Sequence, residues 1–200
     1  MTNLFVAIYI KFFFLMTPFF LMSTFLSMTS DIQIKERKRI ALKVTFAVIV
    51  ISLILFLIGN YIFSLFGITL NSFRIGTGIL LFLSAISLVQ GADKVQSRET
   101  QADISVVPLA IPVTVGPATT GALLVMGVEL LGIWEKAVGI VALISAIVSV
   151  GILLYLSGEI ERIIKKQGVS ILSKVTGLIL SALAAQMIMA GVTSFVTTIK

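Results

Sequence analysis

The chain has no cysteine and no histidine among its 200 residues, and only 12% of those residues are charged. Without cysteine there is no disulfide, no thiolate metal site and no cysteine nucleophile. Without histidine the chain lacks the side chain that most often acts as a general base near neutral pH, and the commonest metal ligand. Soluble domains are about 25% charged, so the low charge argues against a water-soluble fold.

The chain is instead 58% hydrophobic, with a mean hydropathy of +1.14. A helix needs about 20 apolar residues to cross a bilayer. We expect six segments to span the lipid bilayer as helices: residues 4–30, 40–59, 71–91, 104–127, 136–158 and 172–196. This pattern predicts an all-α integral membrane protein with one membrane domain, residues 1–200.

Basic residues gather in the connections after the first, third and fifth spans, which include a polar loop at residues 31–43 and a linker at about residues 92–103. Eleven lie on this side: Lys35, Arg37, Lys38, Arg39, Lys43, Lys94, Arg98, Arg162, Lys165, Lys166 and Lys174. Three lie on the other: Arg74, Lys136 and Lys200. The positive-inside rule puts the richer side in the cytoplasm and both termini outside. The net charge of +6 therefore sits at the membrane surface and does not indicate nucleic-acid binding.

The fourth span contains three prolines and a glycine in the stretch Pro-Leu-Ala-Ile-Pro-Val-Thr-Val-Gly-Pro at residues 108–117. A proline inside a helix costs about 3 kcal/mol, because it lacks a donor and clashes with the preceding turn. Within a membrane a broken backbone is tolerated only where protein buries it or where it lines a watery cavity. The stretch predicts a discontinuous helix whose free amides and carbonyls face a ligand. The alternative is a kinked helix whose freed backbone groups form hydrogen bonds with neighbouring helices.

The first span also contains a proline, in Thr17-Pro18, and one charge, Lys11. A lysine here either extends to the interface or faces a cavity. In the third span, Gly76, Gly78, Ser84 and Ala85 are small enough to let another helix pack closely. Two connecting segments, residues 60–67 and 159–166, are expected to lie at the membrane interface, the first as part of an aromatic belt and the second as an amphipathic helix.

The chain repeats itself at an offset of 99 residues. Pro18 then falls on Pro117, Gly59 on Gly158 and Gly78 on Gly177. Each half holds three spans, with repeat one at residues 1–97 and repeat two at residues 100–200. Because three is odd, the second half enters the membrane from the opposite side. This predicts two inverted three-helix repeats with broken first and fourth helices, an architecture of many secondary transporters.

The two breaks are expected to meet at mid-membrane and form a binding site. Its candidate residues are Thr17, Pro18, Thr114, Gly116, Pro117, Ala118, Thr119 and Thr120. Helix N-termini favour an anionic group, and free carbonyls and hydroxyls suit an ammonium group or an alkali cation. A small zwitterion fits both. The competing interpretation is that the threonines hydrogen-bond back to their own helices.

Several motifs resemble the MarC/SnatA family of bacterial inner-membrane proteins. They are the 108–117 stretch, Thr-Pro in the first span, Phe-Arg-Ile-Gly-Thr-Gly from residue 73 and Gly-Leu-Ile-Leu from residue 177. The resemblance implies transport of small neutral amino acids such as alanine, glycine and serine across the inner membrane. Thr17 and Phe20 depart from the family's usual Asn-Pro-x-Gly, and Ala118 from its Gly-Pro-Gly.

An enzyme is disfavoured because every carboxylate lies in or beside a connecting loop, where no intramembrane acid–base pair can form. The sequence predicts no cofactor and no metal site. It leaves open a channel, an exporter or a scaffold of unknown substrate that transports no amino acid. It also leaves open H⁺ or Na⁺ as coupling ion, and a homo-oligomer.

Overall fold

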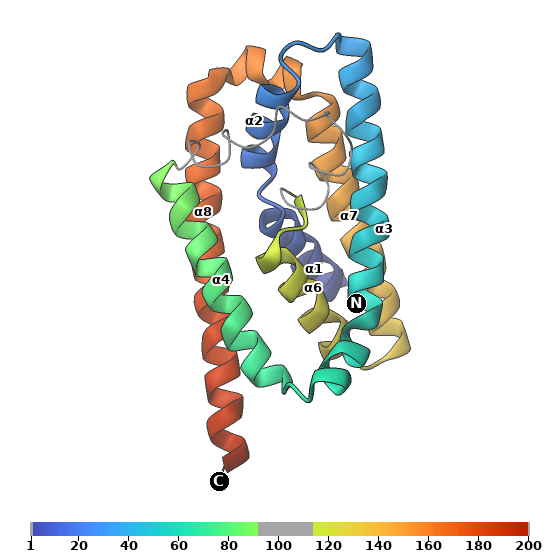
Figure 1. The fold of residues 1–200 in the computed structure, drawn as a ribbon, viewed down its shortest axis with the longest axis vertical. Helices are drawn as coiled ribbons and strands as arrows, with labels where there is room; N and C mark the ends of the chain where they lie inside the picture. Colours follow the sequence, from blue (N-terminus) through green and yellow to red (C-terminus); the bar gives the residue numbers. More distant parts are fainter. Residues whose placement is uncertain (1, 92–113, 200) are drawn as a thin grey trace.

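The structure is a computed structural model that describes residues 2–91 and 114–199 (Figure 1). Every regular element in these ranges is an α-helix. The helices are α1 (Thr2–Leu15), α2 (Pro18–Met28), α3 (Ile34–Phe66), α4 (Leu70–Gln90), α6 (Pro117–Glu129), α7 (Ile133–Tyr155) and α8 (Ser157–Ile199).

Five segments of the described chain are long and apolar enough to cross a membrane: Thr2–Met28, Ile34–Gly59, Leu70–Gln90, Ile133–Tyr155 and Ser157–Thr197. The chain is therefore an all-helical membrane protein with five candidate spans. The linker at residues 92–103 and the first part of the predicted fourth span, with Pro108 and Pro112, lie outside the described residues. Of the rest of that span, residues 114–116 precede α6 and the residues from Pro117 onward belong to it.

The first span is broken, as predicted. α1 ends at Leu15, and α2 begins with Pro18 as its first helical residue. Thr17, which precedes that proline, has φ 46° and ψ 58°, the left-handed region that a non-glycine residue seldom adopts. α6 begins in the same way, with Pro117 in its first turn after Gly116. Proline suits that position because it lacks an N–H that would have no helical partner.

The second span starts earlier than predicted. α3 begins at Ile34, so the basic residues from Lys35 to Lys43 lie on its first turns and not in a polar loop. Lysine and arginine have high helix propensity, but a run of charged residues is also typical of a polar loop, so the start of the helix was predicted too late. At the other end α3 continues through the predicted interfacial segment to Phe66. Phe63 from that segment is buried and packs edge-on against Phe73, with ring centroids 4.8 Å apart.

α8 is bent at Lys165, where φ is 57° and ψ is 167°. The segment predicted as an interfacial helix lies mostly before this bend and is helical. In Figure 1 the first turns of α8 cross the end of the bundle before the helix turns to run alongside α4.

Glycines bring α4 and α8 into backbone contact. A Cβ on Gly78 would lie 2.6 Å from Ile188 Cγ1 and 3.1 Å from the Ala184 carbonyl oxygen. A Cβ on Gly177 would lie 2.9 Å from Val89 Cγ2 and 3.0 Å from the Ala85 carbonyl oxygen. Close packing is thus confirmed for Gly78 and Ala85.

The same prediction is wrong for two neighbours on α4. Gly76 has no atom of the described residues within 4 Å of where its Cβ would lie, and Ser84 is exposed. Each residue advances about 100° around the axis, so Gly76 lies about 160° and Ser84 about 120° from Gly78.

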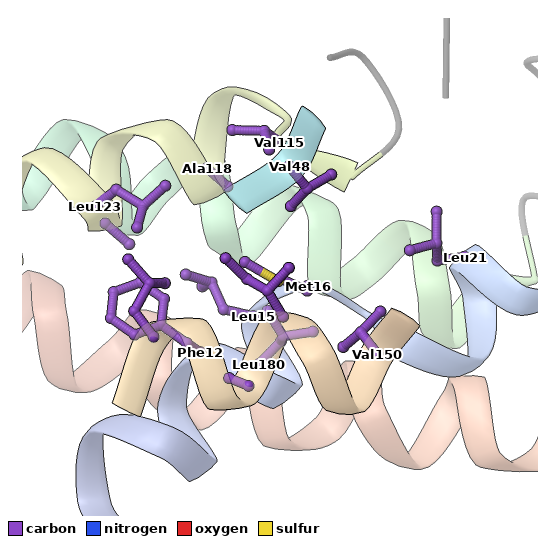
Figure 2. Packing of buried hydrophobic residues seen from close by; sticks show 14 of the residues in the cluster. Phe12, Leu15, Met16, Leu21, Val48, Val115, Ala118, Leu123, Val150 and Leu180 are labelled. Carbon is purple, nitrogen blue, oxygen red and sulfur yellow. The ribbon is translucent and has the colours of Figure 1, made fainter. Parts of the chain in front are cut away.

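The core surrounds the break in the first span. Phe12, Met16 and Leu21 are completely buried. Figure 2 shows Met16 and Leu15 packed among side chains of α3, α6 and α7, including Val48, Ala118 and Val150. In Figure 1, α1, α2 and α6 accordingly lie between the pair α4 and α8 and the pair α3 and α7.

The α4–α8 contact yields a stability prediction. Gly177→Val should destabilise the protein by about 1–3 kcal/mol, because an overpacked contact must separate the two backbones. Thermal unfolding of detergent-solubilised protein measures this. Gly76→Ala is the matched control and should be neutral or slightly stabilising, because nothing opposes the added methyl. An equal loss in both variants would assign the effect to helix backbone and not to the contact.

Candidate functional site

The break between α1 and α2 consists of Met16 and Thr17. The Thr17 N–H donates to the Phe14 carbonyl oxygen at 2.9 Å, and the Thr17 carbonyl accepts from Leu21 N–H at 2.9 Å. The chain thus turns sharply while most of its peptide groups keep partners. The carbonyl of Leu15, at the end of α1, finds its partner elsewhere in the chain.

That partner is Thr119, in the first turn of α6. Its Oγ1 donates to the Leu15 carbonyl oxygen at 3.4 Å, over a separation of 104 residues, and the bond is buried. At 3.4 Å this bond is longer than the range of about 2.5–3.0 Å that is usual for O–H···O, so it is a weak one. It is the hydrogen bond by which the first turn of α6 meets the end of α1.

The space between the breaks is nearly closed. A cavity of about 10 Å³ is lined by Met16, Leu21, Val44, Thr45, Val48, Thr114, Ile147, Val150, Gly151 and Leu154. A cavity of this size holds about one water molecule. Among the described residues this cavity is too small to hold an amino acid.

A larger hollow lies between α4 and α6, and we call it the α4–α6 groove. It has a volume of about 600 Å³, and among the described residues it is lined by Ile68, Ser72, Phe73, Gly76, Thr77, Leu80, Pro117, Thr120 and Gly121. It thus includes two of the predicted site residues, Pro117 and Thr120.

The predicted site residues are therefore divided. Buried in the interior are Pro18, Thr114, Ala118 and Thr119, whereas Thr17, Gly116 and Thr120 are half-buried and Pro117 is exposed. Sequence position alone could not separate these groups, because consecutive residues on one helix face different neighbours.

The threonines of the predicted site do not all follow the alternative in which each hydroxyl bonds back to its own helix. Thr45 and Thr176 do bond back, to the carbonyl oxygens of Ala41 at 2.8 Å and Leu172 at 2.9 Å. Thr119 instead bonds across to Leu15. Thr17 and Thr120 have no side-chain hydrogen bond to any residue that the structure describes. Back-bonding is thus wrong for Thr119 and does not occupy the hydroxyls of Thr17 and Thr120.

Sequence reasoning missed an ion pair at one end of this region. Arg74 of α4 donates to Glu129 Oε1 at the end of α6, through Nε at 3.0 Å and Nη2 at 2.7 Å. Arg74 Nη1 also donates to Asn71 Oδ1 at 3.2 Å. The two side chains are only 17% and 28% exposed. An arginine inside an apolar span needs a counter-charge, and Glu129, at the end of another span, was the available signal.

Lys11 belongs to the same cluster. It is half-buried, and it interacts electrostatically with both Glu129 and Arg74. Whether Lys11 extends to the interface or faces a cavity stays a prediction. Glu129 therefore forms an ion pair with Arg74 and interacts with Lys11 at longer range.

Comparisons with known proteins match the chain to one family of integral membrane proteins. The family model described as "MarC family integral membrane protein" matches residues 2–196. A UPF0056 membrane protein of Methanocaldococcus jannaschii is 34% identical over 199 residues, covering 94% of this chain and 95% of its own. The UPF0056 membrane protein YhcE of Escherichia coli is 30% identical, covering 92% of both chains. No solved structure matches significantly.

The Arg74–Glu129 pair can be tested directly. Glu129→Gln leaves Arg74 and Lys11 without their carboxylate, so it should destabilise the protein by about 1–3 kcal/mol, between the effects at surface and buried pairs. Thermal unfolding at low and high salt measures it. Glu135→Gln, at the same end of the bundle, removes only an exposed helix-capping contact and serves as control. Equal melting temperatures for Glu129→Gln and wild type would exclude a stabilising role for the pair.

Proposed function

The chain belongs to the MarC family of integral membrane proteins, and we propose that it is a secondary transporter of small neutral amino acids such as alanine, glycine and serine. The resemblance of its motifs to MarC/SnatA proteins suggests this substrate class. The names of the relatives state only that they are membrane proteins. The proposal is for alternating access in the plasma membrane, with both termini outside.

An inverted repeat is the first part of the proposal, and the helix boundaries support it. α2 and α6 begin at Pro18 and Pro117, which are 99 residues apart. α3 and α7 begin at Ile34 and Ile133, again 99 residues apart. The offset suggested by three residues in the sequence thus recurs in the helix starts.

The contacts of α4 and α8 support the same repeat. Gly78 lies against Ala184 and Ile188, whereas Gly177 lies against Ala85 and Val89. Adding 99 to each member of the pair 78 and 85 gives 177 and 184, so the two contacts are the same contact with the partners exchanged. Such reciprocity is what a two-fold axis produces. We propose that a pseudo-two-fold axis passes between these helices.

The substrate site is proposed at the two breaks, and the observation that carries it is the buried bond from Thr119 to the Leu15 carbonyl. It joins the equivalent interruptions of the two proposed repeats. The first turns of α2 and α6 would offer amides to a carboxylate. The carbonyls and hydroxyls of Thr17, Thr114 and their neighbours would offer acceptors to an ammonium group or a Na⁺ ion.

Transport then requires the closed centre to open. With about 10 Å³ between the breaks, substrate cannot enter until the halves move apart. Thr119 exchanges its bond to Leu15 for one to the substrate as this happens, so the carbonyl and hydroxyl that close the site are also its ligands. The proposed driving ion is H⁺ or Na⁺, and transport under each gradient distinguishes the two.

The decisive experiment is uptake of labelled alanine or serine into proteoliposomes, with an imposed H⁺ or Na⁺ gradient. Thr119→Val should lower uptake at least tenfold, because it removes the hydroxyl while keeping the shape, and Thr119→Ser should retain most of it. Pro117→Ala should also impair uptake if the break forms the site. Thr176→Val, which removes a back-bonded hydroxyl, is the control.

Each alternative function gives a different result. Flux that ignores both gradients indicates a channel, and outward flux alone indicates an exporter. No amino-acid flux under any gradient indicates a scaffold or another substrate. Uptake that survives in both Thr119→Val and Pro117→Ala would contradict a site at the breaks and favour the kinked-helix interpretation.

A further inference from the structure

The α4–α6 groove has the size of a ligand site, unlike the space between the breaks. Its volume of about 600 Å³ lies within the range of about 300–1,000 Å³ that is usual for small-molecule pockets. It runs along α4 beside the first turn of α6, where Pro117 and Thr120 line it. It therefore reaches the helix end that the proposed transport mechanism uses.

Two hydroxyls line this groove without a hydrogen-bond partner in the described part of the chain, those of Thr77 and Thr120. Thr77 is only 3% exposed. Its counterpart 99 residues later, Thr176, is equally buried but donates to its own helix. Thr77 Oγ1 is not among the fully buried atoms without a partner, so it reaches the groove, where an occupant can hydrogen-bond to it.

The shape of the groove depends on two glycines. A Cβ at Gly121 would collide with the Thr77 side chain, so this glycine lets Thr77 lie against the backbone of α6. A Cβ at Gly76 would meet no described residue within 4 Å, and Gly76 lines the groove. Phe73 and Leu80 supply an apolar wall. Among the described residues the lining contains no charged side chain.

We infer that the α4–α6 groove is a binding vestibule in which a small amino acid waits before it reaches the breaks, with Thr77 as a residue that selects it. This inference rests on the proposed function. A lipid acyl chain would fill the apolar part but leave both hydroxyls unpaired. An amino acid of the alanine or serine size satisfies the hydroxyls with its polar groups and leaves its small side chain to Phe73 and Leu80.

Accessibility is the first test, and the chain suits it because it contains no cysteine. In Gly76→Cys and Thr120→Cys, a membrane-impermeant methanethiosulfonate reagent added to proteoliposomes should react at least tenfold faster than in Ile79→Cys. Ile79 is 49% exposed but does not line the groove, so it reports the lipid-facing side of α4. Millimolar alanine or serine should slow the reaction in the first two variants only.

Two results would overturn the inference. If only a lipid-soluble maleimide labels Gly76→Cys, the groove is filled by lipid. If the aqueous reagent reacts but no amino acid protects, the groove is wet and binds no such ligand. Neither result depends on measured transport, so failure of the vestibule is distinguished from failure of the transporter.

Blocking the groove is the second test. Gly76→Leu should reduce alanine uptake at least tenfold with an unchanged melting temperature, because the side chain enters open space. Ile79→Phe adds similar bulk outside the groove and should leave uptake unchanged. Thr77→Val should raise KM for alanine about tenfold with little change in kcat, and Thr77→Ser should restore it. Normal uptake in both Gly76→Leu and Thr77→Val would refute the vestibule.

Discussion

Backbone satisfaction in an apolar medium is the constraint on which this structure depends. A peptide group freed in hydrocarbon has no water to bind, so an interrupted helix needs a partner inside the protein. At the α1–α2 interruption that partner is Thr119, which reaches the Leu15 carbonyl from the far half of the chain. The residues around it, including Phe12, Met16 and Leu21, are completely buried. The break therefore lies at the centre of the core.

The two ends of the bundle are held by different chemistry. At one end, Arg74 and Glu129 join α4 to α6, and Asn71 completes the guanidinium contacts. At the other, Arg37 donates to the Thr29 carbonyl oxygen at 2.7 Å. There, however, Arg37 Nε and Ser157 Oγ are buried without a partner among the residues described. Unsatisfied donors of this kind cost about 1–3 kcal/mol each. Among the described residues, the polar groups at the Arg74 end are thus better satisfied by hydrogen bonds than those at the Arg37 end.

The sequence was informative where local chemistry decides structure. Pro18 predicted the interruption of the first span, which the structure has at Thr17. The bounds of α4 differ from the predicted bounds by one residue at each end. The sequence was less informative about which neighbour each side of a helix faces. Gly76 and Gly78 looked alike, but one opens onto a groove and the other touches α8. Arg74 and Glu129 are 55 residues apart, and only the fold pairs them. The basic start of α3 resembled a loop because charge masked helix propensity.

The reciprocal contact of α4 with α8 has a mechanical consequence. A Cβ on Gly191 would lie 2.8 Å from the Asn71 carbonyl oxygen, so backbone contact with α8 runs along α4 from Asn71 to Ala85. At about 1.5 Å per residue these contacts cover about 21 Å of helix. Glycines at three points, Gly78, Gly177 and Gly191, keep the two axes close over that length. α4 and α8 therefore form one stiff pair and not two helices that move separately.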